Sequence, residues 1–382
     1  MDFNINQDKK RRKKRQNSFL VYAILLLITI ISIGSSVFFL FSYYQEKERA
    51  VVALQQLEEL ENLEKTETEK ENKEEEVIES GPRMYTEDEV KAEVEVKVNA
   101  KKQEMLDTMQ AMMENGDGPL SLLQYFYPDH VITSSDGRYY FFPILDSLKK
   151  NNFILENFSY PVENEETGSY EGVASYQKED GTYARKGIDV STFQGEIDWE
   201  KVKNDGIEYA IIRLGFRGYE SGKIVLDSRY EENIEGSLAA GLDTGVYFFT
   251  ESLTEMEAIE EADFVIENLE GRKITMPVVI DVEESANTAK SRTKDLTQEQ
   301  RTKNVIAFCN RIKDAGYDVM IYGNLKSFML MMDIEQLEAY DKWFAYYRYP
   351  FHFPYQIKMW QYASWEKVDG IQGGCDVNLM FY

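Results

Sequence analysis

The sequence predicts an α/β fold over residues 185–382, a (β/α)5(β)3 barrel similar to a TIM barrel. Two observations support it. Apolar strand-like runs alternate with helical segments, which indicates a parallel sheet with right-handed crossovers. Near the C-terminus, three further strand-like runs follow without room for full helices between them. Five β/α units and three bare strands give eight strands, enough to close a barrel. The same pattern is also compatible with an open sheet, which is the alternative fold.

The expected elements follow from the apolar runs and their periodicity. Strands are expected at 187–190, 209–216, 245–249, 276–282 and 319–322, and helices at 199–204, 228–240, 254–269 and 297–315. The bare strands are expected at 343–347, 357–362 and 377–381. Gly241 and Gly316 follow two of the helices, as glycine often does at a helix C-terminus.

An uncharged apolar run, residues 19–41, lies near the N-terminus. As a helix rising ~1.5 Å per residue it would span a bilayer. Seven basic residues, 9–15, precede it, so the positive-inside rule places residues 1–18 in the cytoplasm. A cleaved signal peptide is the competing interpretation, but the run is long for one and no clear cleavage motif follows. We therefore expect a single-pass protein of the cell membrane, anchored in the cytoplasmic membrane, with its C-terminal domain extracellular.

Three segments of different character lie between the apolar run and the barrel. Residues 42–84 are rich in glutamate and helix formers, which predicts a charged helical stalk. Residues 85–118 open with a capping box, Thr86 to Glu89, and carry valines and methionines at helical spacing, which predicts an amphipathic helix. A homo-oligomer or a protein partner would use the stalk and this helix. Residues 119–184 are expected to form a small aromatic-rich α+β region and linker, with a helix-like piece at 146–150 and no assignable chemistry.

Composition excludes several classes of function. The net charge is −25, and the only basic run is N-terminal, which argues against nucleic acid as a partner. Two cysteines, Cys309 and Cys375, form neither a disulfide scaffold nor a zinc site alone. Two histidines and the lack of an HExxH motif give no reason to expect a metal or another cofactor. The glycines before Ile224 lack the P-loop spacing, and Ile224 stands where a P-loop needs Ser or Thr.

The run from Met276 to Glu283 is apolar and ends in two carboxylates, Asp281 and Glu283. Because they are two residues apart on a strand, they project to the same side. The C-terminal end of a barrel strand is where catalytic groups lie in this architecture. Asp189 likewise lies near the C-terminal end of the first expected strand, 187–190. Asp376 lies at the last strand, which neighbours the first in a closed barrel.

Four converging acids repel one another, and crowding with partial burial raises at least one pKa. Glycoside hydrolysis needs this, because one carboxyl must stay protonated as the acid while another is ionised. The alternative is that these acids cap helices or pair with Arg213 and Arg217. Sugar binding also needs flat apolar faces. Aromatic residues at or near the strand ends suit a saccharide cleft as a set, although each alone is more often a core residue: Tyr247, Tyr322, Trp343, Tyr347, Trp360 and Tyr362.

These residues resemble the glycoside hydrolase family 25 lysozymes, the Chalaropsis-type muramidases, over roughly half of the chain. The resemblance rests on five pieces in order. They are Gly187-Ile-Asp-Val-Ser191 with Gln194-Gly195 and Ile197-Asp-Trp199, then Asp281-Val-Glu283, then Trp343-Phe-Ala345 with Tyr347, then Trp360-Gln361-Tyr362, and Asp376-Val-Asn378. Phe248 and Glu284 depart modestly from the family pattern.

The resemblance implies a flattened (β/α)5(β)3 barrel that cleaves the β-1,4 bond between N-acetylmuramic acid and N-acetylglucosamine in peptidoglycan. It implies that Glu283 is the proton donor. Asp281 would stabilise the charge that develops on the substrate or orient its acetamido group. Asp189 and Asp376 would maintain the geometry of the site and the protonation states of its acids. Gln361 joins the aromatic set as a substrate-binding residue. The alternative function is a catalytically weak peptidoglycan-binding or scaffold protein of a membrane-associated cell-wall assembly.

Overall fold

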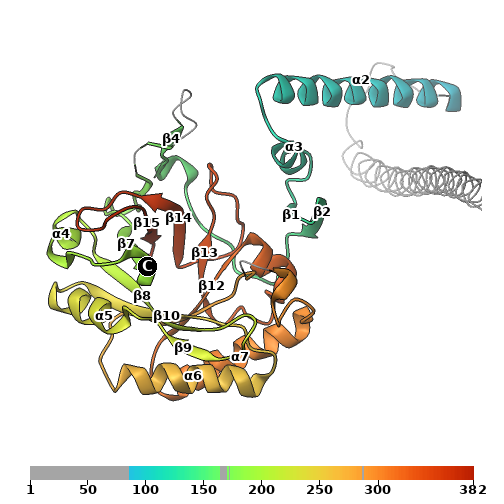
Figure 1. Cartoon of the computed structure of the whole chain (residues 1–382). Coiled ribbons are helices and arrows are strands. Elements are labelled where there is room, and N and C mark those ends of the chain that lie inside the picture. Colours follow the sequence, from blue (N-terminus) through green and yellow to red (C-terminus); the bar gives the residue numbers. More distant parts are fainter. Residues whose placement is uncertain (1–85, 164–169, 172, 286–287) are drawn as a thin grey trace, which may run out of the picture. The chain divides into compact units, whose positions relative to one another are not determined.

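The computed structural model describes residues 86–163, 170–171, 173–285 and 288–382 (Figure 1). The apolar run 19–41 and the predicted stalk 42–84 lie outside these residues, so both stay predictions. Within the described ranges, no helix combines the length and apolar character needed to cross a bilayer. The chain divides into two units, one ending at Val98 and one running from Asn99 to Tyr382.

Eight strands of the second unit form a closed barrel (Figure 1). The ring closes because β8 pairs with both β7 and β10, while β15 pairs with both β14 and β7. The open-sheet alternative is therefore wrong. In ring order the strands are β7 (Arg185–Val190), β8 (Tyr209–Arg217), β10 (Asp243–Phe249), β11 (Val278–Asp281), β12 (Val319–Asn324), β13 (Asp341–Ala345), β14 (Met359–Glu366) and β15 (Cys375–Met380).

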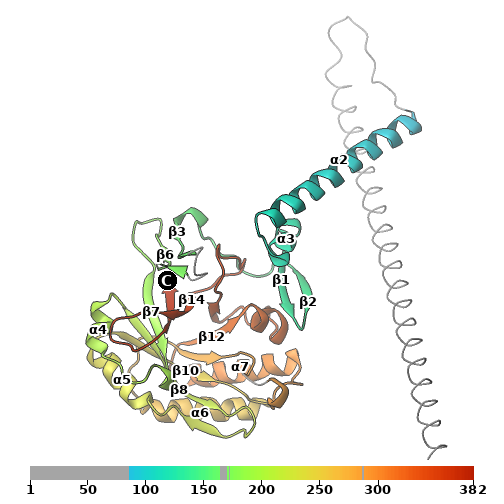
Figure 2. The same cartoon turned by 45° about the horizontal axis from the view of Figure 1, so that its top comes forward.

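Helices cover the outside of the first strands (Figure 2). They are α4 (Trp199–Asn204), α5 (Tyr230–Ala239), α6 (Glu255–Leu269) and α7 (Gln298–Asp314), close to the predicted bounds. Side-chain caps mark the starts of α4, α6 and α7, since Asp198, Thr254 and Thr297 each accept a hydrogen bond from a backbone N–H of the first turn. The fifth unit has only a short π-helix, Ser327–Met331, after β12. A short strand, β9 (Ile224–Leu226), pairs with β8 and was not predicted.

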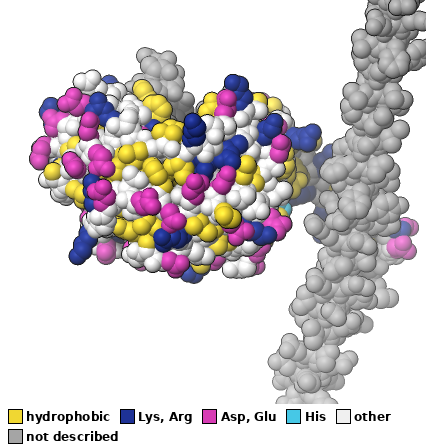
Figure 3. Space-filling view, turned by 60° about the horizontal axis from the view of Figure 1, so that its bottom comes forward, with side chains coloured by type: hydrophobic (Ala, Val, Ile, Leu, Met, Phe, Trp, Pro, Cys, Tyr) yellow, Lys and Arg dark blue, Asp and Glu magenta, His cyan; other side chains and the backbone are white. Residues whose placement is uncertain are grey.

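Charged residues of both signs alternate on the side of the barrel where α6 lies (Figure 3). Several form surface ion pairs, such as Arg311 with Asp263 at 2.6 Å and Lys303 with Glu299 at 2.6 Å. Such exposed pairs contribute little to stability individually. They show that the helical surface is a mixed, solvated face.

Among the described residues, no helix packs on the outer face of β13, β14 and β15, and residues 144–163 and 173–184 cover it instead. Phe153 and Phe158 lie against Phe381, with ring centroids 4.4 and 6.1 Å away, and Phe158 meets Trp360 edge-on at 5.8 Å. The backbone also pairs, because Asn151 N–H donates to the Pro354 carbonyl at 2.8 Å. This segment therefore packs as part of the barrel fold, in contrast to the predicted separate region and linker.

The covering segment has little regular structure of its own. It contains a 3-10 turn (Leu155–Asn157) and two short antiparallel pairs, β3 (Phe158–Ser159) with β6 (Ser175–Tyr176) and β4 (Val162–Glu163) with β5 (Tyr170–Glu171). The helix expected at 146–150 is wrong: these residues form a turn that leads into a bridge between Lys150 and Tyr355. Contacts with the barrel, rather than local propensity, decide this conformation.

Truncating Phe158 tests this packing. Phe158→Ala should lower the free energy of unfolding by about 3 kcal/mol, the usual cost of removing a buried phenylalanine side chain, because Phe158 is only 8% exposed. The measurement is urea unfolding followed by tryptophan fluorescence. Phe193→Ala is the matched control, since Phe193 is 82% exposed. Equal, small effects of both substitutions would contradict the covering role.

The N-terminal part of the described chain begins with the helix α2 (Glu87–Glu114). The predicted capping box is present: Thr86 N–H donates to Glu89 Oε2 at 2.9 Å, and Glu89 N–H donates to Thr86 Oγ1 at 3.3 Å. The helix buries none of its residues in this structure. A second helix, α3 (Pro119–Phe126), and a hairpin of β1 (His130–Ser135) and β2 (Arg138–Pro143) follow.

Candidate active site

A pocket of about 180 Å³ opens at the C-terminal ends of the parallel barrel strands, where the antiparallel strand β15 begins. Its lining comes from strands β7, β10, β11, β12, β13, β14 and β15 or from the residues directly after them. All four predicted acids and five of the seven predicted substrate-binding residues line it: Asp189, Tyr247, Asp281, Glu283, Tyr322, Trp343, Tyr347, Gln361 and Asp376. The fold therefore brings together residues that are almost 190 positions apart in the sequence.

Strand alternation directs Asp281, at the end of β11, and Glu283, two residues after it, into the barrel. Val278, Ile280 and Val282 are fully buried in the core beneath the helices, while Val279 lies in the inner core. Asp281 and Glu283 have the same parity as Val279, so both reach the pocket. Across the barrel, antiparallel pairing sets Asp376 directly opposite Asp189.

A chain of buried hydrogen bonds fixes Asp189. The side-chain amides of Gln361 and Asn378 both donate to Asp189 Oδ2 at 2.8 Å. Trp343 Nε1 donates to Asn378 Oδ1 at 2.8 Å, and the Tyr322 hydroxyl donates to Gln361 Oε1 at 2.7 Å. Asn378 was not predicted as a site residue. Its spacing of two from Asp376 is the signal for it, because both must face the same side of β15.

Burial raises the pKa of all four carboxyl groups. For Glu283, burial and then the charge of Asp189 raise the pKa to about 7, although a hydrogen bond from Asn324 opposes the shift. Burial, followed by the negative charges of Asp189 and Glu283, raises the pKa of Asp376 to about 8. One or more carboxyls of the pocket therefore hold a proton at neutral pH.

The remaining two acids differ in their partners. Burial raises the pKa of Asp189 to about 6, and its hydrogen bonds from Asn378 and Gln361 limit the rise. Burial, followed by the charges of Glu283 and Asp189, raises the pKa of Asp281 well above its ordinary value. Asp281 Oδ1 is also buried and has no hydrogen-bond partner among the described residues. It is open to a donor from a bound molecule.

Nearby arginines do not neutralise the pocket. Arg213 pairs with Asp227 at 2.7 Å, and Arg217 pairs with Glu261 at 2.6 Å and Glu260 at 2.7 Å. The alternative in which these arginines pair with the four acids is therefore wrong. In the part of the chain that the structure describes, no group of three His, Cys, Asp or Glu side chains is arranged to hold a metal ion.

The aromatic residues take different places. Trp343 is 1% exposed and forms the floor of the pocket, with the Tyr322 ring 4.5 Å away. Tyr347 is 44% exposed at the mouth and is available to stack on a sugar ring. Trp360 and Tyr362 do not line the pocket. They flank Gln361 on β14, so alternation turns both toward the outer core.

Glu251 is a buried residue that sequence patterns do not single out. Its carboxylate accepts hydrogen bonds from Ser291 at 3.0 Å and Thr293 at 2.6 Å, and also from Ser285. These hydroxyls belong to the segment that follows Glu283. Glu251 thereby anchors this segment and helps to fix where the Glu283 carboxyl lies.

Comparison with known proteins gives one family match. Residues 188–371, slightly less than half of the chain, match the model described as "Glycosyl hydrolases family 25". Among curated proteins, the chain is 26% identical over 205 residues to the uncharacterized protein YegX of Escherichia coli K12, covering 52% of this chain and 70% of YegX. It is 26% identical over 196 residues to the autolytic lysozyme of Clostridium acetobutylicum, covering 50% of this chain and 55% of the lysozyme.

Among solved structures, one similar protein is the modular autolysin LytC from Streptococcus pneumoniae, in complex with a synthetic peptidoglycan ligand. The TM-score is 0.48 and the sequence identity 21%, over 66% of this chain and 67% of LytC.

Proposed function

We propose that this glycoside hydrolase, whose residues 188–371 match the glycosyl hydrolases family 25, is a muramidase. Its substrate would be the β-1,4 bond between N-acetylmuramic acid and N-acetylglucosamine in peptidoglycan. The family match and the similarity to an autolytic lysozyme support this substrate. One observation carries the proposal. Glu283 shares a pocket with three other carboxyl groups, and burial raises the pKa of each of them.

In this proposal Glu283 is the general acid. A pKa of about 7 keeps its carboxyl largely protonated in mildly acidic solution and about half protonated at neutral pH. It would donate the proton to the glycosidic oxygen as the C1–O bond breaks, and the leaving sugar would depart as an alcohol. As a carboxylate, it would then accept a proton from the attacking water.

Asp281 would orient the acetamido group of the sugar whose bond is cleaved. The acetamido N–H is a donor that suits the unpartnered Asp281 Oδ1. This hydrogen bond would favour the ionised carboxylate and increase the negative charge on the acetamido oxygen, which then attacks C1. Asp189, held by Gln361 and Asn378, would stabilise the positive charge that develops on the sugar.

We also propose that residues 19–41 anchor the enzyme in the cytoplasmic membrane with the barrel on the outer side. The support is in the sequence: an uncharged run of bilayer length directly after a basic segment. Peptidoglycan glycan strands would then lie on the same side of the membrane as the barrel.

Product analysis of purified peptidoglycan tests the proposed reaction. The expected result is release of new reducing ends that are N-acetylmuramic acid, detected by borohydride reduction and mass spectrometry. Reducing ends that are N-acetylglucosamine would contradict the bond assignment. Binding to peptidoglycan without any new reducing ends would instead support the scaffold alternative.

A further inference from the structure

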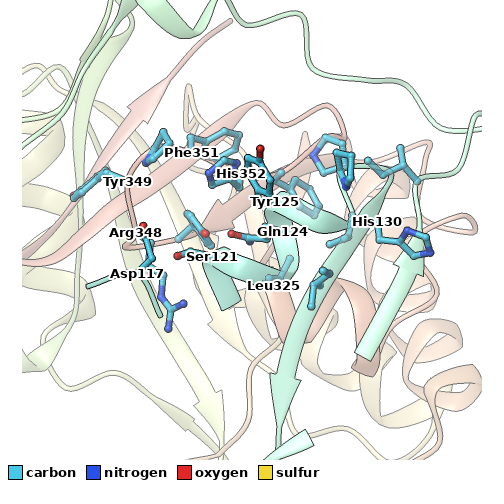
Figure 4. A pocket seen from close by; sticks show the side chains of 18 of the residues that line it. Asp117, Ser121, Gln124, Tyr125, His130, Leu325, Arg348, Tyr349, Phe351 and His352 are labelled. Atoms are coloured by element: carbon cyan, nitrogen blue, oxygen red, sulfur yellow. The ribbon is translucent and has the colours of Figure 1, made fainter. Parts of the chain in front are cut away.

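A second cavity, of about 620 Å³, lies within the unit from Asn99 to Tyr382 (Figure 4). One side is formed by α3 and β1, and the other by the segment 346–354 that follows β13. It is larger than the catalytic pocket. Part of its lining comes from residues before 188, outside the match to the glycosyl hydrolases family 25.

The two cavities are neighbours, because consecutive residues line both. Tyr347 lines the catalytic pocket, while Tyr346 and Arg348 line the second cavity. Likewise, Asn324 hydrogen-bonds Glu283 in the catalytic pocket, and the next residue, Leu325, lines the second cavity. Both connections leave strands at their C-terminal ends. The second cavity therefore lies just across the rim of the barrel from the catalytic acids.

The lining combines apolar rings with polar groups suited to a peptide. Tyr125 comes from α3 and Phe351 from the opposite segment, and Figure 4 shows both at the cavity with Gln124 and Ser121. The two histidines of the chain, His130 and His352, also line it. Gln124 and Ser121 offer donors and acceptors to amide bonds, while the rings offer apolar contact.

Arg348 gives the cavity a charge preference. It is exposed, and no salt bridge to it occurs among the described residues, although Asp117 also lines the cavity. Burial lowers the pKa of His352, which leaves Arg348 as the permanent positive charge there. A guanidinium without a partner favours a carboxylate-bearing ligand. The adjacent catalytic pocket is acidic, so the two cavities select different parts of a substrate.

We propose that the second cavity binds the peptide stem of the peptidoglycan strand whose glycan occupies the catalytic pocket. The inference rests on the proposed function. A stem is attached to the muramic acid beside the scissile bond, which brings it to the rim of the barrel. It carries free carboxylates for Arg348 and amide bonds for Gln124 and Ser121. A neutral glycan extension would leave the Arg348 guanidinium without a partner.

The test compares two substrates, peptide-bearing glycan strands and the same strands after an amidase has removed the stems. Arg348→Ala and Tyr125→Ala should each raise KM for the peptide-bearing strands about fivefold, the order of effect of one lost charge-assisted or aromatic contact. They should leave kcat and the cleavage of stripped strands unchanged. Arg138→Ala and Tyr139→Ala are matched controls, since both residues are exposed on the hairpin and do not line the cavity.

Direct binding supplies a second readout. A synthetic stem tetrapeptide with free carboxylates should shift the amide signals of Gln124 and Arg348 in NMR titrations, and its carboxamide analogue should bind more weakly. Equal losses on both substrates would assign the cavity to glycan and overturn the proposal, as would unchanged KM values in both variants. Failure of the wild-type enzyme to cleave either substrate would instead count against the muramidase function itself.

Discussion

Glu283→Gln should lower kcat on peptidoglycan by about a thousandfold, within the range expected when a general acid is lost. Glutamine keeps the size of the side chain and its hydrogen bond to Asn324, but it has no proton to give to the leaving oxygen. The substitution also removes one of four crowded carboxyls, so the thermal midpoint should not fall. Turbidity loss of purified cell walls, with product counting at long times, measures the effect.

Glu284→Gln is the matched control for that experiment. Glu284 is the next residue, but it is exposed and pairs with Lys326 on the surface at 2.6 Å. Its loss should change kcat by less than about twofold, because exposed ion pairs contribute little. If Glu283→Gln kept more than a tenth of the wild-type kcat, Glu283 would not be the acid.

Asp281→Asn should lower kcat by about a hundredfold and at the same time stabilise the folded enzyme at pH 8. Asparagine cannot become the anionic acceptor that the acetamido N–H requires. The gain in stability has a different origin, because burial and the charges of Glu283 and Asp189 disfavour an ionised Asp281. We expect the thermal midpoint at pH 8 to rise by about 4 °C, equivalent to ~1–2 kcal/mol for a domain of this size.

The sign of the pH dependence follows from proton counting. A carboxyl whose pKa is raised in the folded state holds more protons there than in the unfolded chain. Stability is therefore lost as pH rises from about 4, where unfolded carboxyls ionise, through the raised values of about 6 to 8 for Asp189, Glu283 and Asp376. The advantage of Asp281→Asn should accordingly be small at pH 4 and large at pH 8.

Calorimetry at several pH values between 4 and 8 measures this dependence. Asp263→Asn is the control, since Asp263 is a surface residue paired with Arg311, and its loss should not stabilise the enzyme at pH 8. A midpoint for Asp281→Asn that stays below wild type across the whole range would mean that Asp281 is favourably paired in the fold. The pocket would then not be the repulsive cluster described above.

The barrel was largely predictable because its signals are local. Apolar runs that alternate with helical segments predict the parallel strands and their order. Period-two alternation along β11 predicts that Asp281 and Glu283 point inward. The same rule, applied to β14, excludes Trp360 and Tyr362 from the pocket once Gln361 faces inward. Trp360 and Tyr362 belong to the same motif as Gln361, but as its chain neighbours they face the opposite side of the strand.

Other features depend on distant contacts that no local pattern records. The sequence of residues 144–184 has no helical or strand periodicity of its own. The ring of Phe158 packs on Trp360 and Phe381 of the face of β13 to β15, some 200 positions away. The count of eight strands allows closure of the ring by β15 and β7 but does not decide it against an open sheet. The cavity between α3 and the segment 346–354 arises only from the folded arrangement.

A crystal structure of the Glu283→Gln variant with a peptidoglycan oligosaccharide tests the central claim most directly. The account predicts that the glycosidic oxygen between N-acetylmuramic acid and N-acetylglucosamine lies within hydrogen-bond distance of the side chain at position 283, with the acetamido N–H on Asp281 Oδ1. An oligosaccharide bound with its glycosidic oxygens out of reach of position 283, or bound away from the mouth of the barrel, would contradict it.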